Sequence, residues 1–245
     1  MIDDTNNIIV VENLVKKFGS FVANNNLTFN VKKGEIFGFL GANGAGKTTA
    51  IKQLCGLLRP TSGKAVVAGY DIFTEAEKVK RNIGYMSQKF SLYDDLTVFE
   101  NLRFYGGIYG LLWAEIKSRA EYFIELLGLE NSRNTILKDI PLGWKQKLAF
   151  STALIHRPEI VFMDEPTGGV DPVTRRQFWE MIYQTAETGV TIFVTTHYMD
   201  EAEYCHRLSI MVEGKIVVLD TPKNMIKHYK AKNMDEVFIK LARNT

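Results

Sequence analysis

Residues 41–48, GANGAGKT, place three glycines directly before a lysine and a threonine. This stretch fits the spacing G-x-x-x-x-G-K-[ST] in full. Glycines let backbone N–H groups curl around anionic oxygens, and a helix starting at Lys47 would point its positive end at the same place. The predicted cradle for a nucleoside triphosphate consists of Gly41, Ala42, Asn43, Gly44, Ala45, Gly46, Lys47, Thr48 and Thr49. We expect Lys47 to reach the β- and γ-phosphates and Thr48 to bind Mg²⁺. A glycine-rich turn with an incidental Gly-Lys-Thr is the alternative, and it is disfavoured because a strand precedes the loop and a helix follows it.

Two acids follow an apolar run further along the chain. Residues 160–163 are IVFM, and Asp164 and Glu165 come next. A buried strand that ends in a carboxylate delivers that charge to the edge of the sheet where ligands bind in open α/β folds. We expect Asp164 to hold the metal through water and Glu165 to polarise an attacking water. Two acids at the start of a loop are common without any such role, but the phosphate cradle favours the functional interpretation.

His197 follows the apolar segment VTIFVTT, again at the expected end of a strand. An imidazole at this place can bind a γ-phosphate oxygen and hold the water in position. A lone histidine is more often a surface or core residue, which is how we interpret the other three: His156, His206 and His228. No spacing of histidine and cysteine resembles a zinc site.

The elements that must position these residues alternate between strands and helices. Strands are predicted over 8–18, 27–40 with a tight turn at 32–34, 64–67, 83–87, 160–163, 190–195, 208–212 and 215–219. Helices are predicted over 47–58, 172–187, 199–204 and 234–242. Helical periodicity also runs through residues 96–155 and predicts a helical insertion. Strands that alternate with helices indicate an α/β fold with a mainly parallel sheet.

Composition narrows the class of protein. The chain has 245 residues, 46% of them hydrophobic and 24% charged, which is typical of a globular domain. A net charge of +2 gives no electrostatic footprint for nucleic acid, so no nucleic-acid partner is expected. Cys55 and Cys205 are expected to be free buried thiols rather than a disulfide. The polar, acidic start MIDDTNNIIV does not resemble a signal peptide, and no apolar run approaches the roughly 20 residues of a membrane-spanning helix. The chain is therefore expected to be soluble, or to reach a membrane only through a partner.

The chain resembles the ATPase domain of ABC proteins in three motifs and their order: the glycine loop, Asp-Glu-Pro-Thr at 164–167 and Thr-Thr-His at 195–197. The resemblance covers residues 8–220. It implies a P-loop NTPase core with a mainly parallel sheet, an N-terminal antiparallel β-subdomain and an inserted α-helical subdomain. The implied boundaries are a core at about 1–95 and 156–220, a helical subdomain at about 96–155, and a short helical tail at 221–245.

The resemblance also implies roles for single residues. Gln88 matches the loop that senses the metal and contacts the membrane partner, so it is a candidate for both catalysis and metal binding. His197 matches the histidine that switches with the γ-phosphate, and Asp171 matches the segment that crosses the dimer interface. Phe18 matches the aromatic residue that stacks on adenine. A core role for Phe18 stays open, and Phe21 is close by in the sequence.

One motif departs from the family. The signature Leu-Ser-Gly-Gly-x-x-Gln falls at residues 140–146, where Pro141 replaces the serine and Leu142 the first glycine. Gly143 and Gln146 remain. In the family this segment caps the γ-phosphate bound by the opposite subunit. Pro141 still suits a helix start, but a hydroxyl donor is lost. Since a charge-assisted hydrogen bond contributes roughly 1.5–3 kcal/mol, we expect slower turnover rather than none.

The implied function is ATP hydrolysis by a homodimer or heterodimer that closes around two ATP–Mg²⁺ and drives a separate transmembrane permease. The short tail and the hairpin at Glu213-Gly214 resemble the exporter branch, so we expect export, from the cytoplasmic side of the membrane. The groove beside Gln88, lined by 89–93 and by Phe104, Tyr105 and Tyr109, is the expected docking surface. The alternative is a soluble ABC ATPase, such as one for iron–sulfur cluster assembly.

Overall fold

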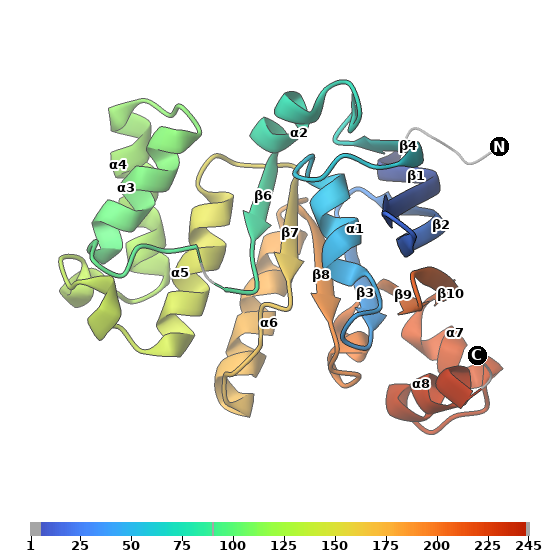
Figure 1. Ribbon diagram of the computed structural model, residues 1–245. Helices are drawn as coiled ribbons and strands as arrows, with labels where there is room; N and C mark the ends of the chain where they lie inside the picture. Colours follow the sequence, from blue (N-terminus) through green and yellow to red (C-terminus); the bar gives the residue numbers. More distant parts are fainter. Residues whose placement is uncertain (1–5, 90, 244–245) are drawn as a thin grey trace.

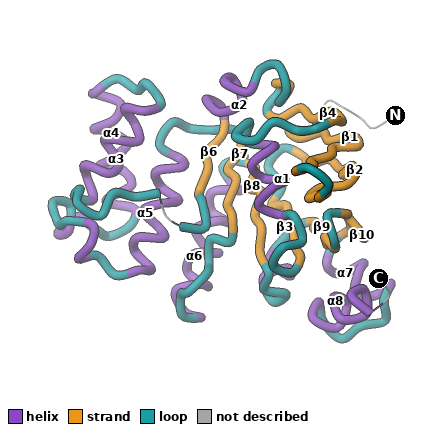
Figure 2. Tube along the Cα trace, in the orientation of Figure 1, coloured by secondary structure: helices purple, strands orange, loops and turns teal. Residues whose placement is uncertain are grey.

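The computed structural model describes residues 6–89 and 91–243, in which helices flank the larger of two β-sheets (Figures 1 and 2). The helices of the insertion gather at one side of the larger sheet, and the smaller sheet lies at the other side (Figure 1). Within the described residues, no helix combines the length and the apolar character needed to cross a bilayer.

The smaller sheet is antiparallel, with its strands in the order β2-β1-β4-β5. These strands are β1 (Asn7–Phe18), β2 (Phe21–Lys32), β4 (Ser62–Val67) and β5 (Tyr70–Asp71). The register of β1 slips between Val11 and Leu14, where Asn13 has φ +50°, a conformation that asparagine tolerates better than most residues. The strand predicted from residue 27 starts earlier, at Phe21, because it pairs with the full length of β1.

The larger sheet has the order β10-β9-β3-β8-β7-β6. Its strands are β3 (Ile36–Gly41), β6 (Ile83–Met86), β7 (Ile160–Asp164), β8 (Thr191–Thr196), β9 (Arg207–Val212) and β10 (Lys215–Asp220). All neighbours are parallel except β9 and β10, which form the predicted hairpin. Every residue of β3, β7 and β8 is buried, as expected for parallel strands covered on both faces. The carboxyl ends of the parallel strands therefore meet at one edge, the lower one in Figure 1.

Aromatic side chains join the two sheets. Phe29 of the smaller sheet stacks on Phe37 of the larger one, with ring centroids 5.7 Å apart, and also contacts Phe39 and Phe193. Phe162 completes the cluster against Phe193 at 5.2 Å. Such rings bury large apolar areas and prefer defined geometries, so they hold the strands that end at the lower edge in a fixed relation.

The helices are α1 (Lys47–Leu54), α2 (Ala76–Asn82), α3 (Val98–Ile108), α4 (Trp113–Leu126), α5 (Leu142–Leu154), α6 (Pro172–Glu187), α7 (Pro222–His228) and α8 (Met234–Arg243). Three of them, α3, α4 and α5, fill the predicted helical insertion. Short 3₁₀ helices occur at η2 (Glu130–Ser132), η3 (Leu137–Asp139) and η4 (Glu201–Tyr204). The start of α3 is fixed by Thr97, which accepts a bond from the Glu100 N–H while the Glu100 carboxylate accepts one from the Thr97 N–H.

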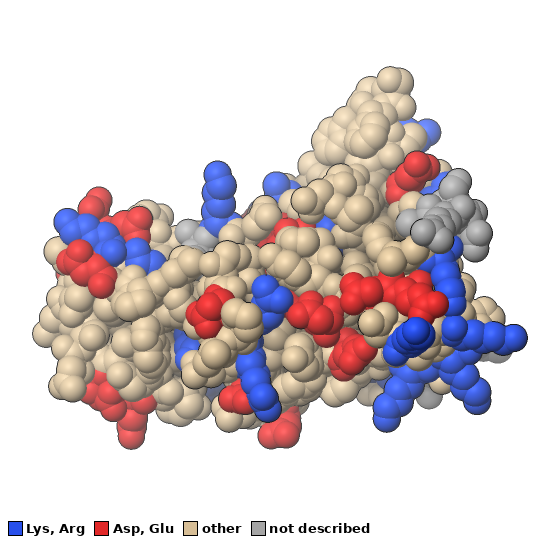
Figure 3. Space-filling model, turned by 90° about the horizontal axis from the view of Figure 1, so that it is seen from below, with Lys and Arg blue, Asp and Glu red and all other residues tan. Residues whose placement is uncertain are grey.

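Several boundaries differ from the prediction. The helix expected to reach Leu58 ends at Leu54, because Cys55 caps it and Gly56 adopts φ +67°. The segment predicted as a helix from Met199 is a 3₁₀ turn that begins at Glu201. Both cysteines are free and buried, as predicted, and burial raises the pKa of each thiol. On the face seen in Figure 3, acidic and basic side chains are interspersed, with basic ones gathered at the right-hand side.

Candidate active site

The glycine loop connects β3 to α1 at the lower edge of the larger sheet. Gly46 has φ +102°, and a Cβ there would lie 2.4 Å from the carbonyl oxygen of Ala23. A Cβ on Gly41 would lie 2.6 Å from the carbonyl oxygen of Met211. Only glycine fits these places, since the loop runs directly against the backbone of β2 and β9. The loop thus holds the first turn of α1, with its unpaired N–H groups, at the strand ends.

Lys47 begins α1 and folds back into the loop. Its side chain is 4% exposed, and its Nζ donates to the carbonyl oxygens of Gly41 at 2.8 Å and Ala42 at 3.2 Å. The same Nζ lies 3.1 Å from Glu165 Oε1. The ammonium group is therefore anchored at the centre of the loop by three oxygen partners.

Asp164 and Thr48 lie together beside this lysine. Asp164, which is 2% exposed, accepts hydrogen bonds from Thr48 Oγ1 at 3.3 Å and from Thr195 Oγ1 at 2.7 Å. No group of three or more histidine, cysteine or acidic side chains able to hold a metal occurs in the described residues. One carboxylate with one hydroxyl is the sparse oxygen donor set that Mg²⁺ uses when substrate phosphates and water supply the other ligands, so these residues fit the predicted metal.

Glu165 is the point where the catalytic candidates meet. Its backbone has φ +49°, and its N–H is held by the carbonyl and hydroxyl oxygens of Thr195 at 3.1 and 3.0 Å. Gln88 Nε2 donates to Glu165 Oε2 at 3.0 Å, and His197 Nδ1 lies 3.1 Å from that same oxygen. With Lys47 on the other oxygen, three side chains from three different segments converge on one carboxylate. The sequence predicted all four residues, but not their direct contacts.

A cavity of about 430 Å³ opens beside this cluster. Its lining consists of Phe21, Ala23, Asn43, Gly44, Gly46, Lys47, Thr48, Thr49, Gln88 and Glu165. Phe21, which is 63% exposed, is therefore the aromatic residue at the cavity. Phe18 is absent from the lining, and the Lys16 ammonium lies 4.9 Å from the centroid of its ring. Phe18 and Phe21 face each other across the β1–β2 turn. Sequence reasoning preferred Phe18 and did not include Ala23.

The three predicted binding residues that follow Asp139 in the sequence, Gly143, Gln146 and Asp171, lie outside the lining of that cavity. Gly143 is in the first turn of α5, where a Cβ would lie 2.6 Å from the Thr174 side chain. Asp171 caps α6 by accepting from the N–H groups of Val173 and Thr174, each at 3.0 Å. The hydrogen bond from the Thr174 hydroxyl, together with these two, lowers the pKa of Asp171. Gln146 is fully buried, and its Nε2 donates to the carbonyl oxygen of Pro166 at 2.5 Å. In Figure 1, α5 lies on the opposite side of β6 from α1.

A strand–glycine loop–helix unit with its lysine, hydroxyl and strand-end carboxylates defines a P-loop nucleotide-binding domain. The family model described as "ABC transporter" matches residues 24–168. The chain belongs to this family, as one of its ATP-binding domains. The fold class expected from the sequence is thereby confirmed.

Curated proteins of this family are similar to the chain over most of its length. The "Probable multidrug ABC transporter ATP-binding protein YbhF" of Escherichia coli (strain K12) is 49% identical over 218 residues, which are 89% of this chain and 38% of that protein. The "Linearmycin resistance ATP-binding protein LnrL" of Bacillus subtilis (strain 168) is 39% identical over 219 residues, 89% of this chain and 70% of that protein. The first name refers to an ABC transporter and the second to drug resistance, so the alternative of a soluble ATPase is not favoured.

Solved structures agree with this assignment. The "ATP binding subunit of ABC transporter" has a TM-score of 0.85 at 27% identity and covers 96% of this chain and 99% of that one. The dimeric post-hydrolysis structure of the ATP-binding cassette MJ0796, bound to ADP and Pi, has a TM-score of 0.78 at 26% identity and covers 87% and 98%.

Proposed function

We propose that this chain hydrolyses ATP to ADP and phosphate as the nucleotide-binding subunit of an ABC exporter. The observation that carries the proposal is the convergence of Lys47, Gln88 and His197 on Glu165, next to a glycine-lined cavity. In-line attack of water on a terminal phosphate needs a residue that orients the water next to a phosphate cradle, and Glu165 lies at that place.

Each residue has a defined task in that reaction. Glu165 accepts the proton of the attacking water and orients it. Lys47 leaves the Glu165 carboxylate for the phosphate oxygens, so binding of the triphosphate frees the base at the moment it is needed. His197 and the loop N–H groups hold the γ-phosphate as negative charge develops on it. Phe21 or Phe18, at the exposed turn of the small sheet, offers a stacking face for the adenine ring.

Mg²⁺ would be held by Thr48 and Asp164, with Gln88 at its outer side. When bound, the ion neutralises charge on the β- and γ-phosphate oxygens. The Thr195 hydroxyl donates a hydrogen bond of 2.7 Å to the Asp164 carboxylate. This bond keeps the carboxylate oriented toward Thr48, the other proposed metal ligand.

The active unit is a head-to-tail pair of such domains. Gly143 and Asp171 lie outside the cavity of their own chain, which is what a role toward a second copy's nucleotide demands. A solved neighbour is a dimer bound to ADP and Pi, which supports the same arrangement here. Pro141 is the N-cap of α5 and donates no side-chain bond, so each site in a pair of these chains lacks one hydroxyl.

The permease would dock in a second cavity, of about 630 Å³, which is lined mainly by residues of α2, β6 and α3. Its lining includes Leu57, Tyr85, Tyr105, Ile108 and Tyr109, which offer apolar anchors for a short helix of the partner. Ser91 also lines it. Of the docking residues expected from the sequence, Phe90 lies outside the described residues, and Tyr93 and Phe104 pack on each other at 4.6 Å.

Export follows from the relatives, whose names refer to multidrug transport and linearmycin resistance. The cargo is chosen by the permease. The subunit would sit on the cytoplasmic side of the membrane, held there by that partner.

The test is made on the purified chain and on detergent extracts. Lys47→Ala should abolish ATP binding and hydrolysis, measured as phosphate release. Ile108→Glu, in the docking cavity, should prevent co-purification of a multi-span membrane protein and leave ATP hydrolysis by the isolated chain intact. Leu126→Glu changes another exposed apolar residue, outside that cavity, and should do neither. If the Lys47 variant consumed ATP like the wild type, the proposed reaction would be wrong.

A further inference from the structure

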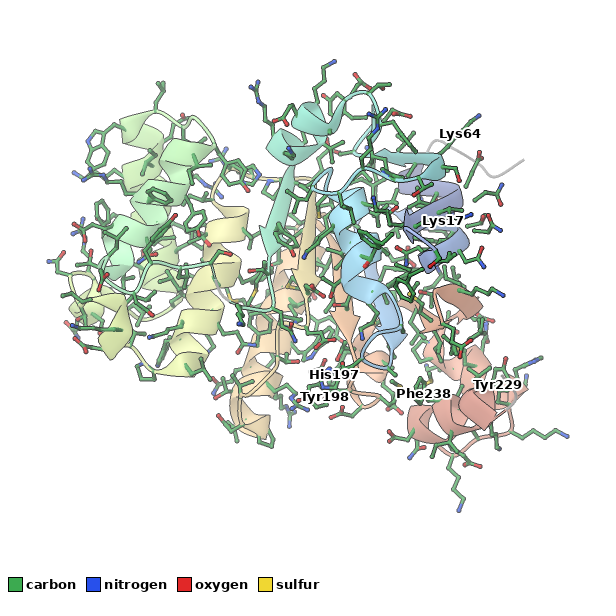
Figure 4. The ribbon with its side chains drawn as sticks, viewed as in Figure 1. Lys17, Lys64, His197, Tyr198, Tyr229 and Phe238 are labelled. Carbon is green, nitrogen blue, oxygen red and sulfur yellow. The ribbon has the colours of Figure 1, made fainter. Side chains whose placement is uncertain are left out.

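A series of side-chain contacts leads away from His197, and the mechanism above does not use it. The His197 and Tyr198 rings lie side by side at the lower edge, with centroids 4.1 Å apart (Figure 4). The guanidinium carbon of Arg175 lies 4.3 Å from the centre of the Tyr198 ring. Arg175 belongs to α6, and its Nη1 also approaches Asp200 Oδ2 at 3.4 Å. Arg175 of α6 thus contacts two residues of the loop after β8, Tyr198 and Asp200.

Glu201 is the next partner in this series. Its side chain is 0% exposed, and its Oε1 lies 3.6 Å from Arg175 Nε. The same oxygen accepts a hydrogen bond from Thr167 Oγ1 at 2.5 Å. Burial raises the pKa of Glu201, and the bonds from Thr167 and Thr196 and the charge of Arg175 oppose that rise. An acid without exposure is kept in a fold only where such partners compensate it, so the carboxylate ties the loop after β7 to the loop after β8.

The series ends in α5. Thr167 follows Pro166, whose carbonyl oxygen accepts the bond from Gln146 Nε2. Gln146 and Thr167 are both fully buried, so neither bond competes with water. Gln146 stands three residues after Gly143, on the same helix. Contacts therefore run without a gap from His197, which lies against Glu165, to the helix that carries Gly143.

The two ends of this series have different tasks in the proposed function, on which the inference rests. His197 contacts the nucleotide of its own chain, whereas Gly143 contacts the nucleotide bound by the other copy. A packed, hydrogen-bonded element between two sites carries coupling free energy if both sites bias its position. A buried acid that only stabilises the fold would not do so.

We propose that Glu201 is a positioning residue that couples the two nucleotide sites of the pair. It holds Thr167 and Arg175 so that a shift of the His197 loop moves α5 and Gly143 with it. Occupancy of one site then favours closure of the other.

The experiment compares conservative changes along the series with a matched control. Glu201→Gln keeps the shape and an acceptor for Thr167 but removes the charge that Arg175 faces. Thr167→Val removes the hydroxyl, and Thr167→Ser keeps it. Glu203→Gln makes the same chemical change two residues further on, at an exposed position of η4. For each full-length variant, the ATP dependence of hydrolysis, the affinity for ATP and the melting temperature are measured.

Coupling predicts a specific set of results. In the wild type the Hill coefficient for ATP should exceed 1 and approach about 2, the number of sites. Thr167→Val and Glu201→Gln should move it toward 1 and lower kcat by at least about fivefold, the lower end of usual allosteric couplings. The affinity for the first ATP, before the second site is occupied, should change by less than about twofold, within the scatter of independent sites. Thr167→Ser and Glu203→Gln should behave like the wild type, and the double variant Thr167→Val with Glu201→Gln should be no worse than either single one.

Other results overturn the inference. Variants with an unchanged Hill coefficient and kcat would refute it, as would losses that follow the melting temperature and ATP affinity alone, since those indicate a structural role. A wild type that hydrolyses ATP with a Hill coefficient of 1 also refutes it and leaves the proposed function standing. A wild type that does not hydrolyse ATP at all overturns the proposed function first and the coupling with it.

Discussion

Replacing Glu165 by glutamine should separate ATP binding from ATP hydrolysis. The carboxylate now accepts from Lys47 on one oxygen and from Gln88 on the other, where His197 is also 3.1 Å away. A glutamine has one oxygen and one NH₂ group, so it can accept a hydrogen bond either from Lys47 or from Gln88 and His197, but not from both sides. If its oxygen keeps Gln88 and His197, the NH₂ group faces the Lys47 ammonium, and that ammonium becomes free to bind phosphate.

The sizes of the two effects follow from these contacts. Loss of a positioned general base costs about 10²–10⁴ in rate, or about 3–5 kcal/mol of activation free energy. The Lys47–Glu165 pair is 3.1 Å long, with side chains 4% and 10% exposed, so a bound triphosphate must break a well-shielded contact. A charge-assisted hydrogen bond of this kind contributes about 1.5–3 kcal/mol. Since the two carbonyl bonds of Lys47 remain in the variant, we expect the lower part of that range, and ATP to bind up to about tenfold more tightly.

The assay measures phosphate release under multiple turnover and ATP affinity by equilibrium binding on the same preparation. Glu165→Gln should lose hydrolysis, bind ATP at least as tightly as the wild type, and accumulate as an ATP-bound dimer on size-exclusion chromatography. Glu203→Gln, an exposed change of the same kind, should leave both quantities unchanged. Normal hydrolysis by the Glu165 variant, or ATP binding weakened as in Lys47→Ala, would refute the assignment of Glu165 as the base that Lys47 restrains.

Three further changes test other parts of the structure. Gly46→Ala should abolish ATP binding and lower the free energy of unfolding by about 1–3 kcal/mol, because its Cβ would meet the Ala23 carbonyl at 2.4 Å; Gly69→Ala, at φ +81° in open space, should cost about 1 kcal/mol and leave binding intact. Pro141→Ser restores a hydroxyl at the start of α5 and should raise kcat by about tenfold if Gly143 serves the other copy's nucleotide. Burial lowers the pKa of His156 to about 4 from 6.5, so its folded form binds fewer protons, and stability should fall by about 2 kcal/mol between pH 7 and pH 5. His156→Phe should remove most of that slope in urea unfolding, and an unchanged slope would contradict the assignment.

The catalytic cluster was predictable because its members share one geometric rule. Lys47, Asp164 and His197 each follow a buried apolar strand, and parallel strands bring their carboxyl ends to one edge. Sequence order alone therefore placed them together. Gln88 sits in a loop after a shorter strand, and its place came from the family resemblance rather than from the strand itself.

Other features depended on distances that no local pattern contains. The choice between Phe18 and Phe21 is one case, since both are exposed aromatics facing each other across a two-residue turn. The contact of Gln146 with Pro166 is another, because a glutamine in the first turns of a helix is ordinarily a solvated residue. Glu201 is the third, an acid in an acidic stretch that the fold buries completely. In each case tertiary packing determined the contacts and burial of the side chain, which the local sequence does not indicate.

The early end of α1 brings the segment that follows it into the lining of the cavity proposed for docking. Because the helix stops at Leu54, Cys55 and Leu57 turn into the lining of the docking cavity instead of continuing the helix. An eight-residue helix is about 12 Å long, and this one carries Lys47 at its first position. A short helix thus has the phosphate cradle at one end and the cavity proposed for docking at the other.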